Sequence, residues 1–155
     1  MTAVQMKTIV RETLEWAYSR ETEVEAECYL FASIDMSDCK PALRKSLPQW
    51  LKFLQWALIF WRNVRNCKID LVRKNLEMMK SLRNDFASEI FDASEHIPDG
   101  HYKDTLEEVQ KIYDICLKQV PVLEMTYSNG VRWTCTIKSR RPKYKITVPE
   151  HPTST

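Results

Sequence analysis

The stretch from Gln49 to Ile97 contains neither glycine nor proline, and its apolar residues recur at intervals of three and four. That spacing places them on one face of an α-helix. A single helix of this length would extend about 75 Å at the usual rise of about 1.5 Å per residue. A compact domain of 155 residues is narrower than that. We therefore predict a break near residues 66–69 and two antiparallel helices.

Helical spacing together with start and stop signals predicts further helices over residues 2–19, 23–34, 41–45 and 105–119. The second of these opens at a capping box formed by Thr22 and Glu25. The last ends at Val120 and Pro121, because the residue before a proline disfavours the helical conformation.

The apolar period changes from helical to alternating after Pro121. The alternating residues are Leu123, Met125, Tyr127, Val131, Trp133, Cys135 and Ile137. A three-residue loop of Ser128, Asn129 and Gly130, with Gly130 left-handed, would pair Trp133 with Met125. All seven apolar residues would then share one face of a hairpin. Alternation at Tyr144, Ile146 and Val148 indicates a third strand.

The predicted fold class is α+β and predominantly α-helical. Five or six helices form a bundle, with a two- or three-stranded antiparallel β-meander packed on it. We expect one globular domain over residues 1–148, helical over 2–120 and β-meander over 121–148. The tail at 149–155 is expected to be disordered.

The five cysteines are odd in number, widely spaced and form no C-x-x-C pair. With no secretory signal visible at the start, this pattern favours reduced thiols and an intracellular location, cytoplasmic or nuclear. Cys67, Cys116 and Cys135 fall on predicted core faces, where inert buried thiols are expected. The apolar stretch at 47–61 is too short for a membrane span.

Charge is arranged in blocks that the net charge of +2 conceals. Residues 12–38 and residues 84–108 each carry eight acidic side chains and one basic side chain. Residues 40–83 carry eleven basic and two acidic side chains, and residues 132–145 carry six basic and no acidic ones. Blocks of this kind create strong local potentials.

The basic blocks favour a non-enzymatic protein that binds RNA or single-stranded nucleic acid. The segments expected to make contact are 138–145 and 62–83. In the first segment the residues are Lys138, Arg140, Arg141, Lys143, Tyr144 and Lys145, with Tyr144 placed to stack on a base. In the second they are Arg62, Arg65 and Arg73.

Two structural alternatives compete with this interpretation. The acidic helices at 23–34 and 105–119 would neutralise the central basic helices if they packed against them. The cluster at 138–145 would then protect an edge strand from aggregation, a common use of lysine.

A second functional hypothesis concerns the Trp-rich helix at 47–64. Trp56 and Ile59 project away from the face that carries Trp50 and Trp61, and exposed aromatics on a helix are typical of protein interfaces. The chain would then be a small accessory or adaptor protein, for example a viral one. It would bind a protein partner or form a homodimer through this helix.

No catalytic residue, cofactor or metal site is predicted. Two glycines in the whole chain are too few for a glycine-rich phosphate-binding loop. His96 and His101 flank a Pro-Asp-Gly turn and are expected to lie in a solvated loop. An enzyme whose site carries no recognisable motif is the third alternative.

Overall fold

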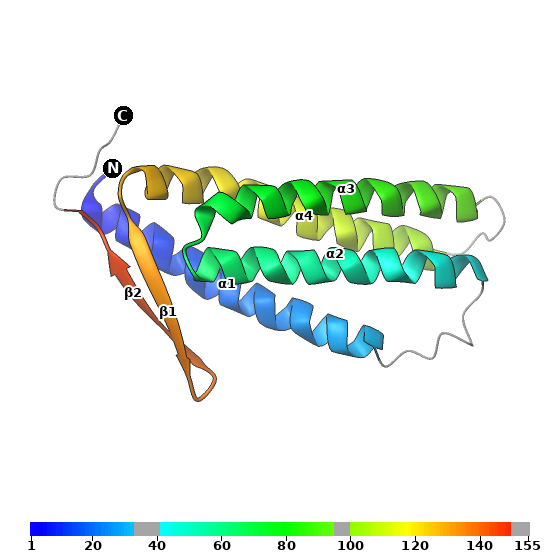
Figure 1. Cartoon of the computed structure of the whole chain (residues 1–155), viewed down its shortest axis with the longest axis horizontal. Coiled ribbons are helices and arrows are strands. Elements are labelled where there is room, and N and C mark those ends of the chain that lie inside the picture. Colours follow the sequence, from blue (N-terminus) through cyan, green and yellow to red (C-terminus); the bar gives the residue numbers. More distant parts are fainter. Residues whose placement is uncertain (33–40, 95–99, 150–155) are drawn as a thin grey trace.

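The computed structural model describes residues 1–32, 41–94 and 100–149, and side chains within 1–28, 50–88 and 106–149. These residues form four helices and one two-stranded antiparallel sheet (Figure 1). The elements are α1 (Ala3–Ala32), α2 (Pro41–Arg65), α3 (Ile69–Ser94), α4 (Gly100–Ser128), β1 (Arg132–Lys138) and β2 (Arg141–Thr147). The predominantly helical α+β class is confirmed, while five or six helices was an overestimate.

The first two predicted helices are one continuous helix, α1. The predicted capping box at Thr22 is wrong, because the Thr22 hydroxyl donates to the Tyr18 carbonyl four residues back, inside the helix, at 3.0 Å. Buried Leu14, Ala17 and Val24 keep one face of α1 against the core across this point. In the same way, α2 merges the predicted helix at 41–45 with the one that follows it.

The predicted break between the two central helices is confirmed. Arg65 ends α2, and Cys67 has a positive φ of 59°. The Lys68 amide donates to the Asn63 carbonyl at 2.9 Å, and the Cys67 amide donates to the Val64 carbonyl at 3.2 Å. This pair of bonds is the Schellman motif, which satisfies the last carbonyls of a helix and reverses the chain.

The predicted strand over 123–127 is wrong, because α4 continues through Pro121 as far as Ser128. Its last turns bury Val120, Leu123 and Thr126 against the core. That spacing of three is helical, so the alternation of apolar residues was coincidental. Met125 therefore lies in a helix and cannot pair with Trp133 across a sheet.

Gly130 ends helix α4 rather than forming a hairpin loop. Its amide donates to the Tyr127 carbonyl at 3.0 Å, and the Val131 amide donates to the Thr126 carbonyl at 3.1 Å. These bonds form a second Schellman motif. The left-handed conformation predicted for Gly130 is confirmed by its φ of 87°.

The hairpin of this protein joins β1 to β2. The strand predicted as the third of the meander is β2, the second strand of a two-stranded sheet. Trp133 lies opposite Ile146, and the register runs from Arg132–Thr147 to Lys138–Arg141. The loop is the two residues Ser139 and Arg140, with φ of 51° and 61°. Positive φ at both positions is the requirement of a type I′ turn.

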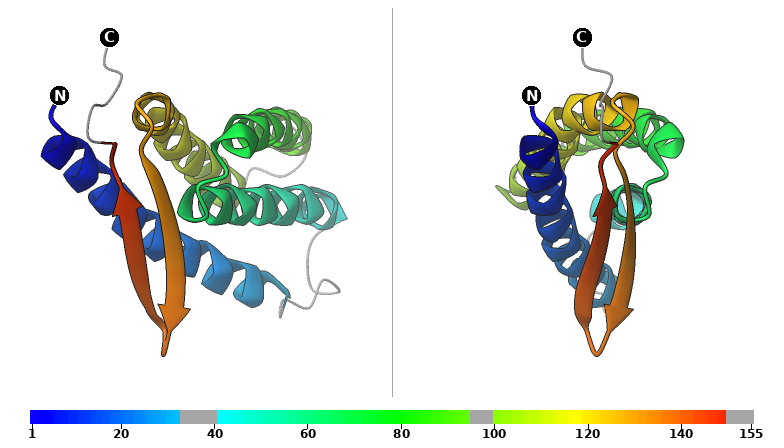
Figure 2. Two further views of the ribbon diagram at one scale, coloured as in Figure 1. Left: turned by 60° about the vertical axis from the view of Figure 1, so that its left-hand side comes forward. Right: turned by 90° about the vertical axis from the view of Figure 1, so that its left-hand side faces the viewer.

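The four helices run alternately up and down, and the hairpin crosses one end of the bundle beside α1 (Figures 1 and 2). Helix α2 packs against both α1 and α3, and α3 packs against α4. Phe53, Phe60 and Trp61 of α2 are fully buried at the centre of the core. In the described part of the chain, no helix has the length and apolar character needed to cross a membrane.

Candidate functional site

The hairpin has one face turned to the bundle and one turned to solvent, because side chains alternate along each strand. The inner face buries Trp133 and Ile146 and half-buries Cys135 and Tyr144. We call the opposite side the outer face. All eight of its side chains are exposed: Arg132, Thr134, Thr136, Lys138, Arg141, Lys143, Lys145 and Thr147.

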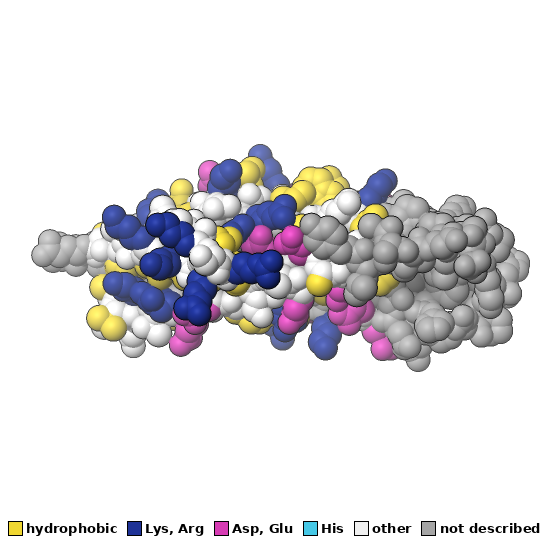
Figure 3. Space-filling model, turned by 90° about the horizontal axis from the view of Figure 1, so that it is seen from below, with side chains coloured by type: hydrophobic (Ala, Val, Ile, Leu, Met, Phe, Trp, Pro, Cys, Tyr) yellow, Lys and Arg dark blue, Asp and Glu magenta, His cyan; other side chains and the backbone are white. Residues whose placement is uncertain are grey.

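Positive charge on the outer face is not balanced within the hairpin. No acidic residue occurs between Arg132 and Thr147. Lys138 lies directly opposite Arg141, and like charges in that position destabilise a strand pair. Among the described residues, no ion pair engages a basic side chain of the hairpin. Figure 3 shows Lys and Arg side chains gathered at the hairpin end of the face seen from below.

Arg132 differs from the other basic residues of the outer face. Its guanidinium donates to the carbonyls of Tyr127 and Val131, both at 2.8 Å, and lies 3.6 Å from the centre of the Tyr127 ring. Arg132 therefore stabilises the junction between α4 and β1. The freely exposed cations are Lys138, Arg140, Arg141, Lys143 and Lys145.

The tip of the hairpin projects away from the helices (Figures 1 and 2). Ile137, although on the inner face, is 43% exposed, whereas Trp133 at the base is 3% exposed. The Tyr18 hydroxyl of α1 donates to the Arg140 carbonyl at 3.2 Å. The bundle thus holds the tip by its backbone and leaves its basic side chains in solvent.

Two aromatic side chains anchor the inner face. The Trp133 indole donates to the Val64 carbonyl at 2.7 Å, and the Tyr144 hydroxyl donates to the Leu14 carbonyl at 2.9 Å. Burial raises the pKa of the Tyr144 phenol, so this hydroxyl stays protonated and keeps donating. Tyr144 therefore lies on the side away from the exposed cations with which the sequence had grouped it.

The central arginines predicted to extend the basic surface are paired with acidic residues. Arg62 and Arg65 reach the buried Glu21 carboxylate at 3.3 and 3.0 Å. Arg73 pairs with Glu124 of α4. In this part of the molecule, opposite charges pair within the fold, but Glu21 and Glu124 lie outside the helices at 23–34 and 105–119 that the first structural alternative named. Arg65 also lies behind the hairpin, against Cys135, and is not part of the outer face.

The two residues predicted for a protein interface lie on α2. Trp56 is half-buried and packs against the core, while Ile59 is 37% exposed. Most of the indole surface that would anchor a partner is therefore already in contact with the protein itself.

The three thiols expected on core faces are poorly suited to nucleophilic chemistry. Cys116 is buried, whereas Cys67 and Cys135, expected on core faces, are half-buried. Burial raises the pKa of all three, so they are protonated at neutral pH. Cys39 and His96 lie outside the described residues, as does the side chain of His101. Within the described residues, no cluster of three metal-binding side chains is found.

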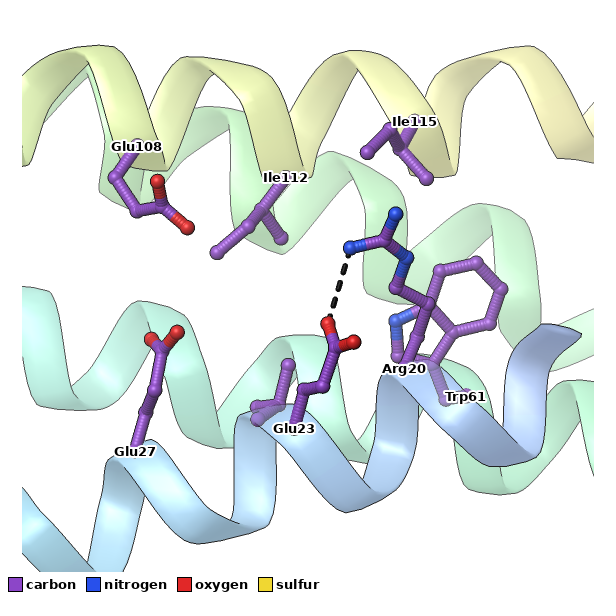
Figure 4. A pocket seen from close by; sticks show the side chains of 8 residues that line it. Arg20, Glu23, Glu27, Trp61, Glu108, Ile112 and Ile115 are labelled. Atoms are coloured by element: carbon purple, nitrogen blue, oxygen red, sulfur yellow. Dashed lines mark hydrogen bonds and ion pairs between the residues drawn. The ribbon is translucent and has the colours of Figure 1, made fainter.

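A small cavity lies where α1, α2 and α4 meet (Figure 4). Glu23 and Glu27 approach it from α1, and Glu108 approaches it from α4. Burial raises the pKa of Glu27, and the charges of Glu108 and Glu23 raise it further. The volume of about 30 Å³ suits a single water molecule rather than an organic substrate.

The sequence located the cations of 138–145 but not the surface that they form. The missing members, Thr134 and Thr136, belong to β1, which the sequence had paired with the wrong segment. Alternation of polar residues from Arg132 to Lys138 and from Arg141 to Lys145 was the available signal. Only the register between the two strands brings these rows together.

Comparison with protein-family models, curated proteins and solved structures finds no match for this chain. Its function is therefore inferred from its own side chains.

Proposed function

We propose that this protein is a non-enzymatic nucleic-acid-binding protein and that the outer face of the hairpin is its contact surface. The main support is the contrast between the three central arginines that were expected to bind and the cations of the hairpin. Arg62, Arg65 and Arg73 form ion pairs within the bundle, whereas the exposed cations of the hairpin form none among the described residues. Cations left unpaired on an exposed strand pair suit the phosphates of a nucleic-acid backbone.

The tip of the hairpin supports this role. Arg140 has a positive φ, a conformation that glycine adopts without steric cost. Its neighbours Lys138 and Arg141 repel each other across the strands. A chain selected only for stability would place Asn-Gly in this turn. Local costs of this kind concentrate at functional sites, and a bound phosphate would offset the repulsion.

A second candidate function is binding of a protein partner, or of a second copy, through α2. The observation that favours it is the exposure of Ile59 beside the half-buried Trp56. It ranks second because the Trp56 ring already packs on the core of its own molecule.

The test is binding of labelled oligonucleotides by fluorescence anisotropy at low salt. We expect wild-type protein to bind with a Kd of about 1–100 μM at physiological salt, the range of backbone-dominated contacts, and more tightly at low salt. A variant with Lys138, Arg141, Lys143 and Lys145 changed to Ala removes four cations from the outer face. We expect its affinity to fall at least about a hundredfold, since each phosphate contact strengthens binding at low salt.

The matched control changes four exposed lysines on α3 and α4 to Ala: Lys74, Lys80, Lys111 and Lys118. It alters the net charge by the same amount and should retain most of the affinity. Circular dichroism establishes that both variants are folded. Equal losses in the two variants, or no binding by wild-type protein, would overturn the proposal. Binding to anionic vesicles without binding to nucleic acid would also overturn it.

A further inference from the structure

The outer face and the tip of the hairpin carry no aromatic side chain. Proteins that bind single strands generally stack bases on exposed aromatic rings. The two rings of this hairpin, those of Trp133 and Tyr144, both face the bundle, and their polar groups donate to Val64 and Leu14. A single strand lying on the outer face would find cations but no ring to stack on.

The shape of the hairpin suits a groove. Two strands lie about 4.8 Å apart, and seven residues extend about 24 Å. The ribbon is exposed along one entire face, and its tip extends beyond the bundle (Figure 2). The major groove of B-form DNA is about 12 Å wide and admits a two-stranded ribbon. The major groove of A-form RNA is too narrow for side chains to enter.

The side chains of the outer face are arranged in two unlike rows. β2 presents three cations in succession, Arg141, Lys143 and Lys145. The middle of β1 instead presents the short side chains of Thr134 and Thr136, which lie opposite Lys145 and Lys143. Long cations reach phosphates at the rim of a groove, whereas threonine suits close approach to base edges through its hydroxyl and methyl groups.

We infer that the ligand of the outer face is double-stranded DNA and that the hairpin binds in the major groove as a ribbon. This inference rests on the proposed function and names its substrate class. The cations of β2 and of the tip contact phosphates, and Thr134 and Thr136 approach the groove floor.

The experiment compares one sequence as duplex DNA, as each of its single DNA strands and as duplex RNA. We expect duplex DNA to bind at least about tenfold tighter than the other forms. Between about 50 and 200 mM salt, five phosphate contacts give a slope of log K against log salt of about −4.5 on B-form DNA. The same contacts give a slope of about −3.5 on a single strand.

The variant Thr136→Phe makes the test sharper because it should change the affinities for duplex DNA and for single strands in opposite directions. A ring on the outer face blocks entry into the groove and offers a base a stacking surface. We expect weaker binding to duplex DNA and stronger binding to single strands. Ser81→Phe, which adds the same ring to an exposed position on α3, should change neither affinity.

The outcomes separate the inference from the proposed function. Equal or tighter binding of single strands or duplex RNA by wild-type protein overturns the inference and leaves nucleic-acid binding in place. Unchanged duplex affinity in Thr136→Phe also overturns it. Absence of binding to every oligonucleotide overturns the proposed function itself.

Discussion

Single residues at the two Schellman motifs decide how this chain turns. Gly130 and Cys67 both occupy the left-handed position just past the end of a helix. Glycine is the usual residue there because it has no Cβ to clash with the backbone. The sequence identified the conformation of Gly130 because glycine is the strongest signal for it. It missed the conformation of Cys67 because a thiol gives no such signal.

Gly130→Ala should destabilise the protein by about 1–2 kcal/mol, the cost of a left-handed residue with a Cβ. An added Cβ would also lie 3.0 Å from Cγ of Pro149. Chemical denaturation measures the free energy of unfolding. Gly130→Asn is the control, because asparagine tolerates positive φ but meets the same proline. An alanine variant as stable as wild type would contradict the assigned helix cap.

At the scale of elements, the sequence predicted the helices well and their ends poorly. Uninterrupted spacing of apolar residues fixed α3 and most of α2, because burial of one helical face requires that spacing. The errors came from stop signals that packing overrode. Pro121 predicts the end of a helix, yet buried Val120, Leu123 and Thr126 keep α4 helical beyond it. Local propensity is a weak predictor where a helix face is buried.

Pro121→Ala should therefore stabilise the protein, by about 1–3 kcal/mol. Proline inside a helix removes one backbone donor and crowds the carbonyl four residues earlier. Pro121 is exposed, so little packing is lost with its ring. The control is Pro142→Ala in β2. The residue next to the hydrogen-bonded pair that closes a two-residue loop points its backbone nitrogen away from the partner strand. A proline in that position removes no hydrogen bond between the strands, so this change should be nearly neutral. An unchanged or lower unfolding free energy in Pro121→Ala would contradict a continuous α4.

The candidate site shows the same division between local and long-range information. Five of its cations, Lys138, Arg140, Arg141, Lys143 and Lys145, were predicted because they lie within eight consecutive residues of the sequence. The pairing of Arg62 and Arg65 with Glu21 was not predictable, because it joins residues more than forty positions apart. The inward orientation of Tyr144 depends in the same way on α1, through the Leu14 carbonyl.

At the scale of the whole molecule, Arg62, Arg65 and Arg73 of the bundle pair with acidic residues, whereas no ion pair among the described residues engages a basic side chain of the hairpin. Within the bundle, Glu23, Glu27 and Glu108 line the cavity between α1 and α4, and Arg20 pairs there with Glu23 at 3.0 Å. Burial and the neighbouring carboxylates raise the pKa of Glu27 above its ordinary value of 4.5. The folded state then binds a proton more tightly than the unfolded state does, and stability falls as pH rises above 4.5.

Glu27→Gln should be more stable than wild type at pH 7, because glutamine carries no charge to bury. The difference should shrink as pH falls towards 4.5, where wild-type Glu27 also becomes neutral. Because Glu27 is half exposed, solvent screening limits the gain to less than about 1 kcal/mol. Thermal unfolding between pH 4 and 8 measures it. Glu12→Gln, at an exposed position of the same helix, should show no such trend. A gain that is constant with pH would contradict the origin proposed here.

The most direct test of the central claim is to map the contact surface by NMR. Backbone amide shifts of the full chain would be recorded during titration with a short DNA duplex. We expect the largest changes in β1, the tip and β2, with α3 little affected. Changes centred on Trp56 and Ile59 of α2, or changes spread evenly over the molecule, would contradict it.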